Sequence, residues 1–269
     1  MEVLFVESNQ YLIEYYNKGG EDGRLASQHG SVEFLTSMCY IERYLKPGDR
    51  IIEIGAGTGR YSHALARKGY SVDAVELIEH NIEVFKRNTE PNEKITVKQG
   101  NALDLSAFAE NTYDITLLLG PMYHLFTKED KHKAVSEAIR VTQKGGTVFI
   151  AYCISDPSIL VSGFKLKSFS VQEFMDKGFI NPQTFAASSE PALLFEIVRK
   201  ENIDDLMSSF PVSRLHYVAT DGYAFHMKEA IDAMDDAEFD LFMRYHYATC
   251  EREDMVGLTA HSLDIFRKD

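Results

Sequence analysis

The fold is decided by the stretch IIEIGAGTGRY at residues 51–61. The β-branched residues that begin it are typical of a buried parallel strand. Three glycines at alternate positions then predict a tight turn, and the apolar residues that follow have the spacing of one helix face. Strand, glycine turn and helix together predict a nucleotide-binding corner, where backbone N–H groups and the positive end of a helix face a ligand.

The spacing of the glycines narrows the kind of ligand. A dinucleotide fingerprint, G-x-G-x-x-G, would have its third glycine at the position of Arg60, whereas this chain has glycine one residue earlier, at Gly59. No G-K-[ST] ending occurs anywhere in the chain, which excludes a P-loop. From Glu53 to Gly59 the sequence instead has the form E-x-G-x-G-x-G.

This form resembles the first motif of the class I S-adenosylmethionine-dependent methyltransferases. Glu76 supports the resemblance, because it follows a predicted strand at residues 71–75 and stands 19 residues after Gly57. A carboxylate about 20 residues beyond the glycine turn can accept hydrogen bonds from both ribose hydroxyls of an adenosine. The alternatives are a glycine turn in another doubly wound fold, and a solvated Glu76 that begins a helix.

The later strands follow in the order that the resemblance implies. Residues 95–97, 113–119 and 147–152 have the character of the third, fourth and fifth strands, and helices alternate with them. Five such units over residues 50–153 predict a parallel sheet with right-handed crossovers. The fourth strand runs into L-L-G-P-x-Y-H-L, which is similar to a loop in a bacterial subgroup of this family.

The resemblance also implies a cofactor, S-adenosylmethionine, its product S-adenosylhomocysteine, and the residues that hold them. The glycines let the methionine end approach the backbone, Glu76 holds the ribose, and Asn101 faces the adenine with an acceptor oxygen where many relatives have a charged Asp. The carbonyl of Leu119 meets the methionine amino group. The predicted cofactor-binding residues are Tyr16, Glu53, Gly55, Ala56, Gly57, Gly59, Glu76, Leu77, Asn101, Ala102 and Leu119.

Two residues of the L-L-G-P-x-Y-H-L loop are the predicted catalytic residues, because ligands sit at the carboxyl ends of strands in an open α/β sheet. They are Tyr123 and His124, and His124 is suited to act as a general base in an O- or N-methylation. The alternative is a structural histidine, since methyl transfer does not always need a base.

The flanks of this core suggest where an acceptor binds. Residues 1–46 predict an N-terminal helical lid that carries Tyr16 near the sulfonium, with simple helix packing as the alternative. Residues 155–196 predict an insertion, rich in phenylalanine, that either walls an acceptor pocket or acts as a capping element or a homodimer contact. Residues 197–269 should complete the sheet, with a helix at 197–210, strands at 214–220 and 262–267, and helices within 230–250.

Composition excludes several classes of function. The net charge of −13, without a basic run, argues against nucleic-acid partners. The three cysteines lack metal-ligand spacing and H-E-x-x-H is absent, so we expect no metal site and a reducing, cytoplasmic location. No run of 18 apolar residues occurs, so we expect no membrane span.

The sequence therefore predicts one domain, residues 1–269, with a doubly wound, Rossmann-like α/β fold. Its mostly parallel, seven-stranded sheet should have an antiparallel edge strand. The predicted function is S-adenosylmethionine-dependent methyl transfer to a small molecule. A non-catalytic S-adenosylmethionine-binding regulatory protein and a nicotinamide-dependent oxidoreductase remain as alternatives.

Overall fold

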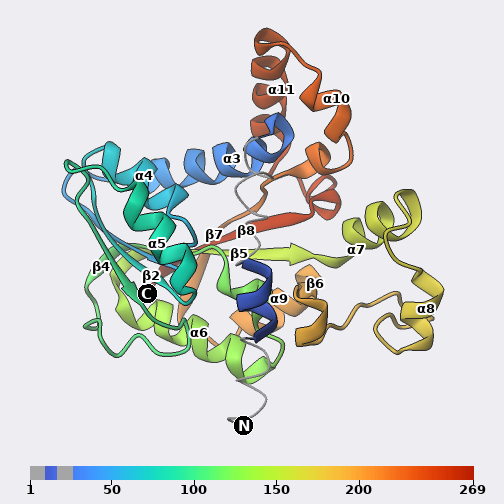
Figure 1. Ribbon diagram of the computed structural model, residues 1–269, viewed down its shortest axis with the longest axis horizontal. Helices are drawn as coiled ribbons and strands as arrows, with labels where there is room; N and C mark the ends of the chain where they lie inside the picture. The colour runs from blue at the N-terminus through green and yellow to red at the C-terminus, as the bar shows by residue number, and fades with distance from the viewer. Residues whose placement is uncertain (1–9, 17–26) are drawn as a thin grey trace.

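A computed structural model describes residues 10–16 and 27–269 of the chain (Figure 1). Its sheet has the strand order β3-β2-β1-β4-β5-β8-β7, and a short β6 pairs with the end of β5. The strands are β1 (Arg50–Ile54), β2 (Ser71–Glu76), β3 (Ile95–Gln99), β4 (Tyr113–Leu118), β5 (Thr142–Ile154), β6 (Ile197–Val198), β7 (Val212–Ala219) and β8 (His261–Lys268). This confirms the predicted doubly wound α/β fold.

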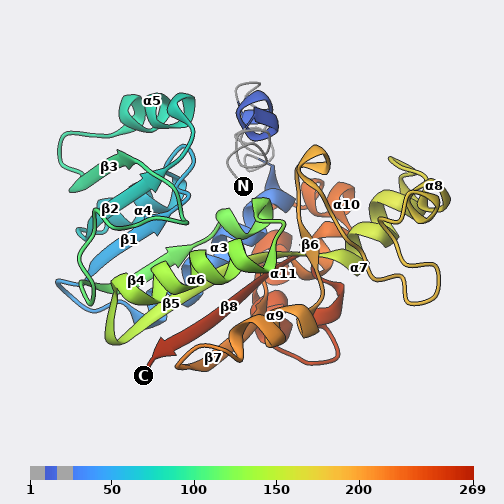
Figure 2. The ribbon, with the colours of Figure 1, turned by 90° about the horizontal axis from the view of Figure 1, so that it is seen from below.

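Helices cover both faces of the sheet (Figures 1 and 2). The α-helices are α3 (Gln28–Tyr44), α4 (Arg60–Arg67), α5 (Glu79–Asn88), α6 (Lys128–Val141), α7 (Ser155–Ser158), α8 (Val171–Asp176), α9 (Lys200–Met207), α10 (Lys228–Asp232) and α11 (Asp236–Thr249). Buried residues of α3 and α4 pack with one face of the strands, and those of α6 and α9 pack with the other. Strands sandwiched in this way are buried on both faces, which explains their continuous apolar runs.

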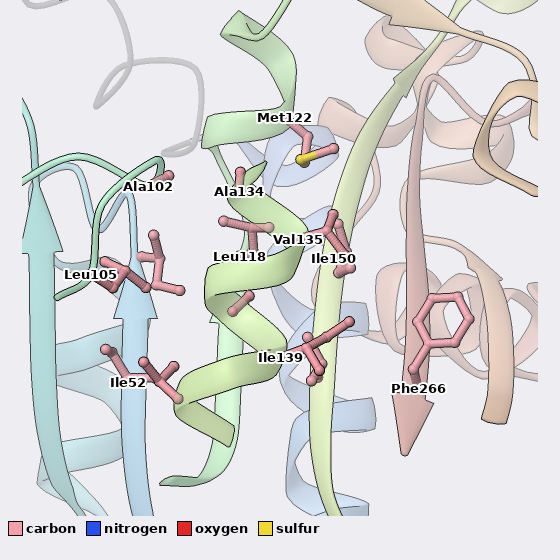
Figure 3. Packing of buried hydrophobic residues seen from close by; sticks show 14 of the residues in the cluster. Ile52, Ala102, Leu105, Leu118, Met122, Ala134, Val135, Ile139, Ile150 and Phe266 are labelled. Carbon is pink, nitrogen blue, oxygen red and sulfur yellow. The ribbon is translucent and has the colours of Figure 1, made fainter. Parts of the chain in front are cut away.

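The core under α6 illustrates the packing (Figure 3). Ala134, Val135 and Ile139 recur at helical spacing on α6 and meet Ile52 and Ile150 of the strands below. All five are buried. This helix is therefore fixed to the sheet by one apolar face.

The register of the central strands brings their carboxyl ends to one level. Ile54 of β1 pairs with Val75 of β2 on one side and with Leu118 of β4 on the other, both in parallel. The residues that come next in the chain, Gly55, Glu76 and Leu119, therefore lie side by side at the same edge. This edge is where ligands bind in open α/β sheets.

Of the last two strands, β8 runs against the direction of the parallel strands and β7 runs with it. β8 is antiparallel to both of its neighbours, β5 and β7, and β7 forms the edge. The start of β8 and the end of β7 consequently lie at the carboxyl edge of the parallel strands. This arrangement confirms the expected mostly parallel sheet with an antiparallel edge.

The prediction of one helix over 197–210 is wrong at its start. Ile197 and Val198 form β6, which pairs with Cys153 and Ile154 of β5, and α9 begins only at Lys200. Two β-branched residues beside the open end of a strand favour extended backbone over a helix turn. The strands predicted at 214–220 and 262–267 correspond to β7 and β8.

The flanking segments bring their own helices. Residues 10–16 are helical, as expected from their aromatic pattern. The rest of the proposed lid up to residue 26 lies outside the described residues. Beyond β5, α7 and α8 extend past the carboxyl end of the sheet (Figure 1). Among the described helices none is long and apolar enough to cross a membrane.

Candidate active site

A cavity of about 1670 Å³ lies at the carboxyl edge of the sheet. Its wall is built from the ends of β1, β2, β4 and β5, from α3, and from the insertion that follows β5. Pockets for a single small ligand usually occupy about 300–1,000 Å³. The cavity therefore has room for two ligands side by side.

The glycine turn forms one end of this cavity. Gly57 has φ of +55°, and a Cβ built on it would meet nothing within 4 Å. A Cβ on Gly55 would instead lie 2.5 Å from Cδ of Pro121. Glycine at 55 thus lets the β4 loop close over the turn, whereas glycine at 57 leaves bare backbone beside open space, where a ligand can approach it.

Gly59 lies in different surroundings from Gly57. It precedes α4 as the N-cap with φ of +92°, and a Cβ there would lie 2.5 Å from the ring of Phe85 and 2.8 Å from Nε2 of His63. Gly59 is absent from the lining of the cavity. Its small size serves the packing of α4 against α5.

Glu76 ties the glycine turn to the next unit. Its buried carboxylate accepts hydrogen bonds from the backbone N–H of Gly57 at 2.7 Å and of Ile78 at 2.8 Å, and from the side-chain amide of Asn81 at 3.3 Å. Burial raises the pKa of Glu76, against the effect of the two backbone donors. A carboxylate offers about four lone-pair sites and these donors occupy three, so one acceptor site remains.

Glu53 lies behind the turn and is buried. The hydroxyl of Ser62 on α4 donates to its carboxyl group. Burial raises the pKa of Glu53 to about 8, with the hydrogen bond from Ser62 opposing the shift and the charge of Glu76 adding to it. The group is therefore mostly neutral at pH 7, and a cation placed near it would favour its ionisation.

Asn101 is fixed by its own turn. Its Oδ1 accepts the backbone N–H of Leu103 at 2.9 Å, which leaves one lone pair and the amide N–H groups for a ligand. Ala102 and Leu77 line the cavity beside it. Only part of the acceptor capacity expected of Asn101 is thus available.

The structure brings Tyr16 and His124 together, although 108 residues separate them. The Tyr16 hydroxyl lies 3.1 Å from Nε2 of His124, and Nδ1 of the same ring lies 2.8 Å from the carbonyl oxygen of Leu194. Since a carbonyl oxygen only accepts, Nδ1 carries a proton, and Nε2 of the neutral ring accepts a hydrogen bond from the Tyr16 hydroxyl. Both ring nitrogens are therefore engaged.

All other predicted site residues line the cavity. Besides Gly57, Glu76 and His124 these are Tyr16, Glu53, Gly55, Ala56, Leu77, Asn101, Ala102, Leu119 and Tyr123. Three aromatic residues of the insertion line the cavity, namely Phe169, Phe174 and Phe179. Two others, Phe164 and Phe185, are exposed. No group of three or more candidate metal ligands occurs among the described residues.

Sequence reasoning missed the opposite end of the cavity. We call this end, formed by Glu33, Asp221 and His261, the β8 side, and the end formed by Gly55, Gly57, Glu76 and Asn101 the glycine-turn side. Asp221 follows β7, His261 begins β8, and Glu33 lies on α3. The predicted strands at 214–220 and 262–267 gave the one available signal, because residues next to strand ends at this edge face the ligand space.

The comparisons with known proteins agree with this geometry. Residues 52–150 match a family model described as "Methyltransferase domain". A demethylmenaquinone methyltransferase of Clavibacter sepedonicus is 31% identical over 115 residues, which are 42% of this chain and 45% of that protein. An S-adenosyl-L-methionine-dependent Diels-Alderase of Talaromyces variabilis is 29% identical over 106 residues, 38% of this chain and 35% of that protein. The chain thus covers less than half the length of these two relatives.

Solved structures share the fold. One is an S-adenosylmethionine-dependent methyltransferase of Thermotoga maritima, described as a possible histamine N-methyltransferase. It superposes with a TM-score of 0.56 at 17% identity, over 97% of this chain and 99% of that one. At this identity the likeness concerns the fold alone, and it extends over the flanks as well as the core.

Proposed function

We propose, from the premise that residues 52–150 form a class I S-adenosylmethionine-dependent methyltransferase domain, that the protein transfers a methyl group to a small-molecule acceptor. The observation that carries the proposal is a continuous cavity of about 1670 Å³, with the glycine turn at one end and polar side chains at the other. An enzyme that transfers a group between two substrates must hold both of them in one enclosed space, in contact with each other.

The glycine-turn side fits the cofactor. Gly57 offers open backbone, Glu76 retains one acceptor site for a ribose hydroxyl, and Asn101 would present one lone pair and its amide N–H groups to the adenine. Leu77 and Ala102 would flank the adenine, and the Leu119 carbonyl would accept from the methionine amino group. Glu53, neutral at pH 7 without a ligand, could ionise as that ammonium group approaches. When bound, S-adenosylmethionine supplies an electrophilic methyl group.

The residues of the chain would then act mainly by position and by exclusion of water. Tyr16, from the helix at residues 10–16, and His124, from the β4 loop, meet over the cavity and narrow it. Phe174 and Phe179 close the insertion side. Holding two reactants at contact distance in a dry site accounts for a large part of the rate enhancement in bimolecular transfers.

The acceptor that we propose is small and neutral or cationic. Of the described residues that line the cavity, six are acidic and two are Lys or Arg. The six are Glu33, Glu53, Glu76, Glu129, Asp130 and Asp221, and the two are Arg60 and Lys228. A cavity with this balance repels polyphosphates, as does the net charge of −13. We therefore propose a metabolite and no nucleic-acid substrate.

A cytoplasmic location is part of the proposal. Cys39, Cys153 and Cys250 are free thiols. Thiols of this kind persist in a reducing compartment.

Transfer of tritium from methyl-labelled S-adenosylmethionine tests the function. The protein is incubated separately with small-molecule, RNA and protein fractions of a bacterial extract, with heat-denatured protein as the control. We expect label chiefly in the small-molecule fraction. Label chiefly in RNA or protein would refute the acceptor class. Cofactor binding without transfer to any fraction would instead favour a protein that uses the cofactor without methylating, as the likeness to the Diels-Alderase allows.

A further inference from the structure

The β8 side of the cavity holds an aspartate–histidine pair that the family resemblance does not assign. His261 is the first residue of β8 and pairs across the sheet with Cys153 of β5. Asp221 follows β7, whose end lies at the same edge because β8 runs antiparallel between β5 and β7. Both side chains line the cavity, together with Glu33 of α3.

Asp221 fixes the orientation of the His261 ring. Its Oδ2 lies 2.8 Å from Nδ1 of His261, and its Oδ1 accepts from the backbone N–H groups of Ala260 at 2.9 Å and His261 at 3.1 Å, and from the Thr259 hydroxyl at 2.5 Å. Burial favours the neutral acid, but His261 and these donors outweigh it and lower the pKa of Asp221. Asp221 is thus an ionised acceptor, and Nδ1 of His261 carries a proton.

The second ring nitrogen of His261, Nε2, is available to a ligand in the cavity. Within the described part of the chain, Nε2 of His261 has no hydrogen-bond partner, and the side chain keeps 18% of its surface exposed. The Nε2 atoms of His63 and His246 also lack partners there, but both are buried and out of reach of a ligand. Both nitrogens of His124 are engaged, by Tyr16 and Leu194. His261 therefore combines an oriented ring with an accessible nitrogen, as a general base requires.

We infer that His261, held by Asp221, accepts the proton of the acceptor's nucleophile, which is a hydroxyl or amine group. The inference rests on the proposed function. The acceptor's oxygen or nitrogen bonds to the methyl carbon, the carbon–sulfur bond breaks with its electron pair on sulfur, and the acceptor's proton moves to Nε2. The positive charge of the sulfonium thus reappears on the imidazolium. His261 is the catalytic residue of this step, and Asp221 is its positioning residue.

Two carboxylates near His261 stabilise the positive charge of its imidazolium form. Glu33 Oε2 lies 3.7 Å from Nδ1, and the Tyr123 ring centroid lies 6.2 Å from that of His261. Burial opposes the charged form, but the carboxylates of Glu33 and Asp221, with Cys153 from β5, raise the pKa of His261 well above its usual value. Lys228 of α10 lines the same cavity. The proton-accepting form therefore becomes more abundant as pH rises above the ordinary range of histidine.

Two substitutions and a matched control test the inference. His261→Asn keeps a donor near Asp221 and removes Nε2, while Asp221→Asn keeps the shape and removes the charge. His132→Asn, an exposed histidine on α6, is the control. Each variant is measured by calorimetric titration with S-adenosylhomocysteine, by thermal melting, and by tritium transfer to the small-molecule extract across pH.

We expect S-adenosylhomocysteine to bind all three variants within about threefold of the wild type. Transfer by His261→Asn should fall at least about 100-fold, the lower end of the usual contribution of a general base. Wild-type transfer should rise with pH along a limb above the ordinary histidine pKa, and this limb should be absent from His261→Asn. His132→Asn should behave as the wild type.

Carbon-13 NMR of ring-labelled histidine adds a readout that does not depend on turnover. The His261 resonance should titrate above the ordinary value in the wild type and move to lower pH in Asp221→Asn. If His261→Asn melts early, His261→Gln replaces it. Transfer by folded His261→Asn or His261→Gln within threefold of the wild type, or titration of His261 at its ordinary pKa, overturns the inference. Failure of the wild type to bind S-adenosylhomocysteine would instead overturn the proposed function.

Discussion

The two ends of the cavity are assembled in opposite ways. The glycine-turn side comes from consecutive β–α units, and its residues lie at or just beyond the ends of parallel strands, as Gly55 follows β1 and Glu76 ends β2. The β8 side joins Glu33 of α3 to Asp221 and His261, which flank the two C-terminal strands. A ligand site built from strand ends in chain order leaves a local signature in the sequence. A site completed by an antiparallel strand inserted between two others does not.

The largest effect should come from the glycine that packs rather than the one that faces the ligand. Gly59→Ala forces a side chain into φ of +92° and against Phe85, so we expect a loss of about 2–4 kcal/mol in the free energy of unfolding. Gly57→Ala is the matched variant, with open space around it, and should cost about 1–2 kcal/mol through its φ of +55° alone. Urea unfolding measures both. Equal losses would contradict the separate roles of the two glycines.

Loss of the proposed ribose contact on the glycine-turn side should rank next. Glu76→Ala removes a carboxylate that also anchors Gly57 and Ile78, and we expect it to weaken S-adenosylhomocysteine binding by about 1.5–3 kcal/mol. This corresponds to about 10- to 150-fold in Kd by calorimetry. The exposed neighbour Glu79→Ala is the control and should leave Kd unchanged. An unaltered affinity in Glu76→Ala would mean that the ribose binds elsewhere.

These two sides also show what the sequence could and could not predict. The parallel core and the residues on the glycine-turn side follow from periodicity and from the rule that ligands meet the carboxyl ends of strands. Gly59 was assigned to the ligand because its spacing is identical whether it packs on Phe85 or faces a cavity. Asp221 and His261 were missed because their contact depends on the position of β8 between β5 and β7, which no local pattern encodes.

The contact between Tyr16 and His124 cannot be predicted from the sequence for a related reason. Each residue was identified within its own segment, but the hydrogen bond between them depends on where the N-terminal helix packs. Conversely, β6 was predicted as helix because two residues are too few to show a strand period. The sequence predicts most helices and strands, but it does not predict the contacts between segments that are distant along the chain.

The pH dependence of stability sharpens the comparison on the β8 side. His261 has a raised pKa in the folded state, so its stabilising effect is complete below the unfolded value of about 6.5 and is lost as pH rises through the folded pKa. The loss should reach about 1.4 kcal/mol per pH unit within that window. Glu53, with its pKa raised to about 8, gives a slope of the same sign between about 4.5 and 8.

The contribution of His261 is therefore measured as a difference between two proteins. The unfolding free energies of the wild type and of His261→Asn are measured in urea from pH 6 to 9. Glu53 contributes the same pH dependence to both proteins, so the difference between the two free energies reports His261 alone. The gap between the two unfolding free energies should narrow as pH rises. His246, whose pKa is lowered by burial, affects a lower pH range. A constant gap would contradict a charged His261 at the β8 side.

The smallest effect should come from the lid. Tyr16→Phe removes the hydrogen bond to His124. We expect this to lower the free energy of unfolding by about 0.5–1.5 kcal/mol. Hydrogen exchange tests whether the segment from Met1 to about Gly30 becomes more protected when S-adenosylhomocysteine binds, as a lid would. The gain in protection should be smaller in Tyr16→Phe and unchanged in Tyr11→Phe, an exposed neighbour. Equal protection with and without the ligand would reduce Tyr16 to a packing residue.

The most direct test of the account is which nucleotide the glycine-turn side binds. Calorimetric titration of the wild-type protein with S-adenosylhomocysteine and, separately, with NAD compares the two ligands that such a fold could hold. The turn with Gly57 beside open space and Gly59 at the N-cap of α4, followed by Glu76, predicts saturable one-to-one binding of S-adenosylhomocysteine and no response to NAD. Saturable binding of NAD without any response to S-adenosylhomocysteine would contradict it.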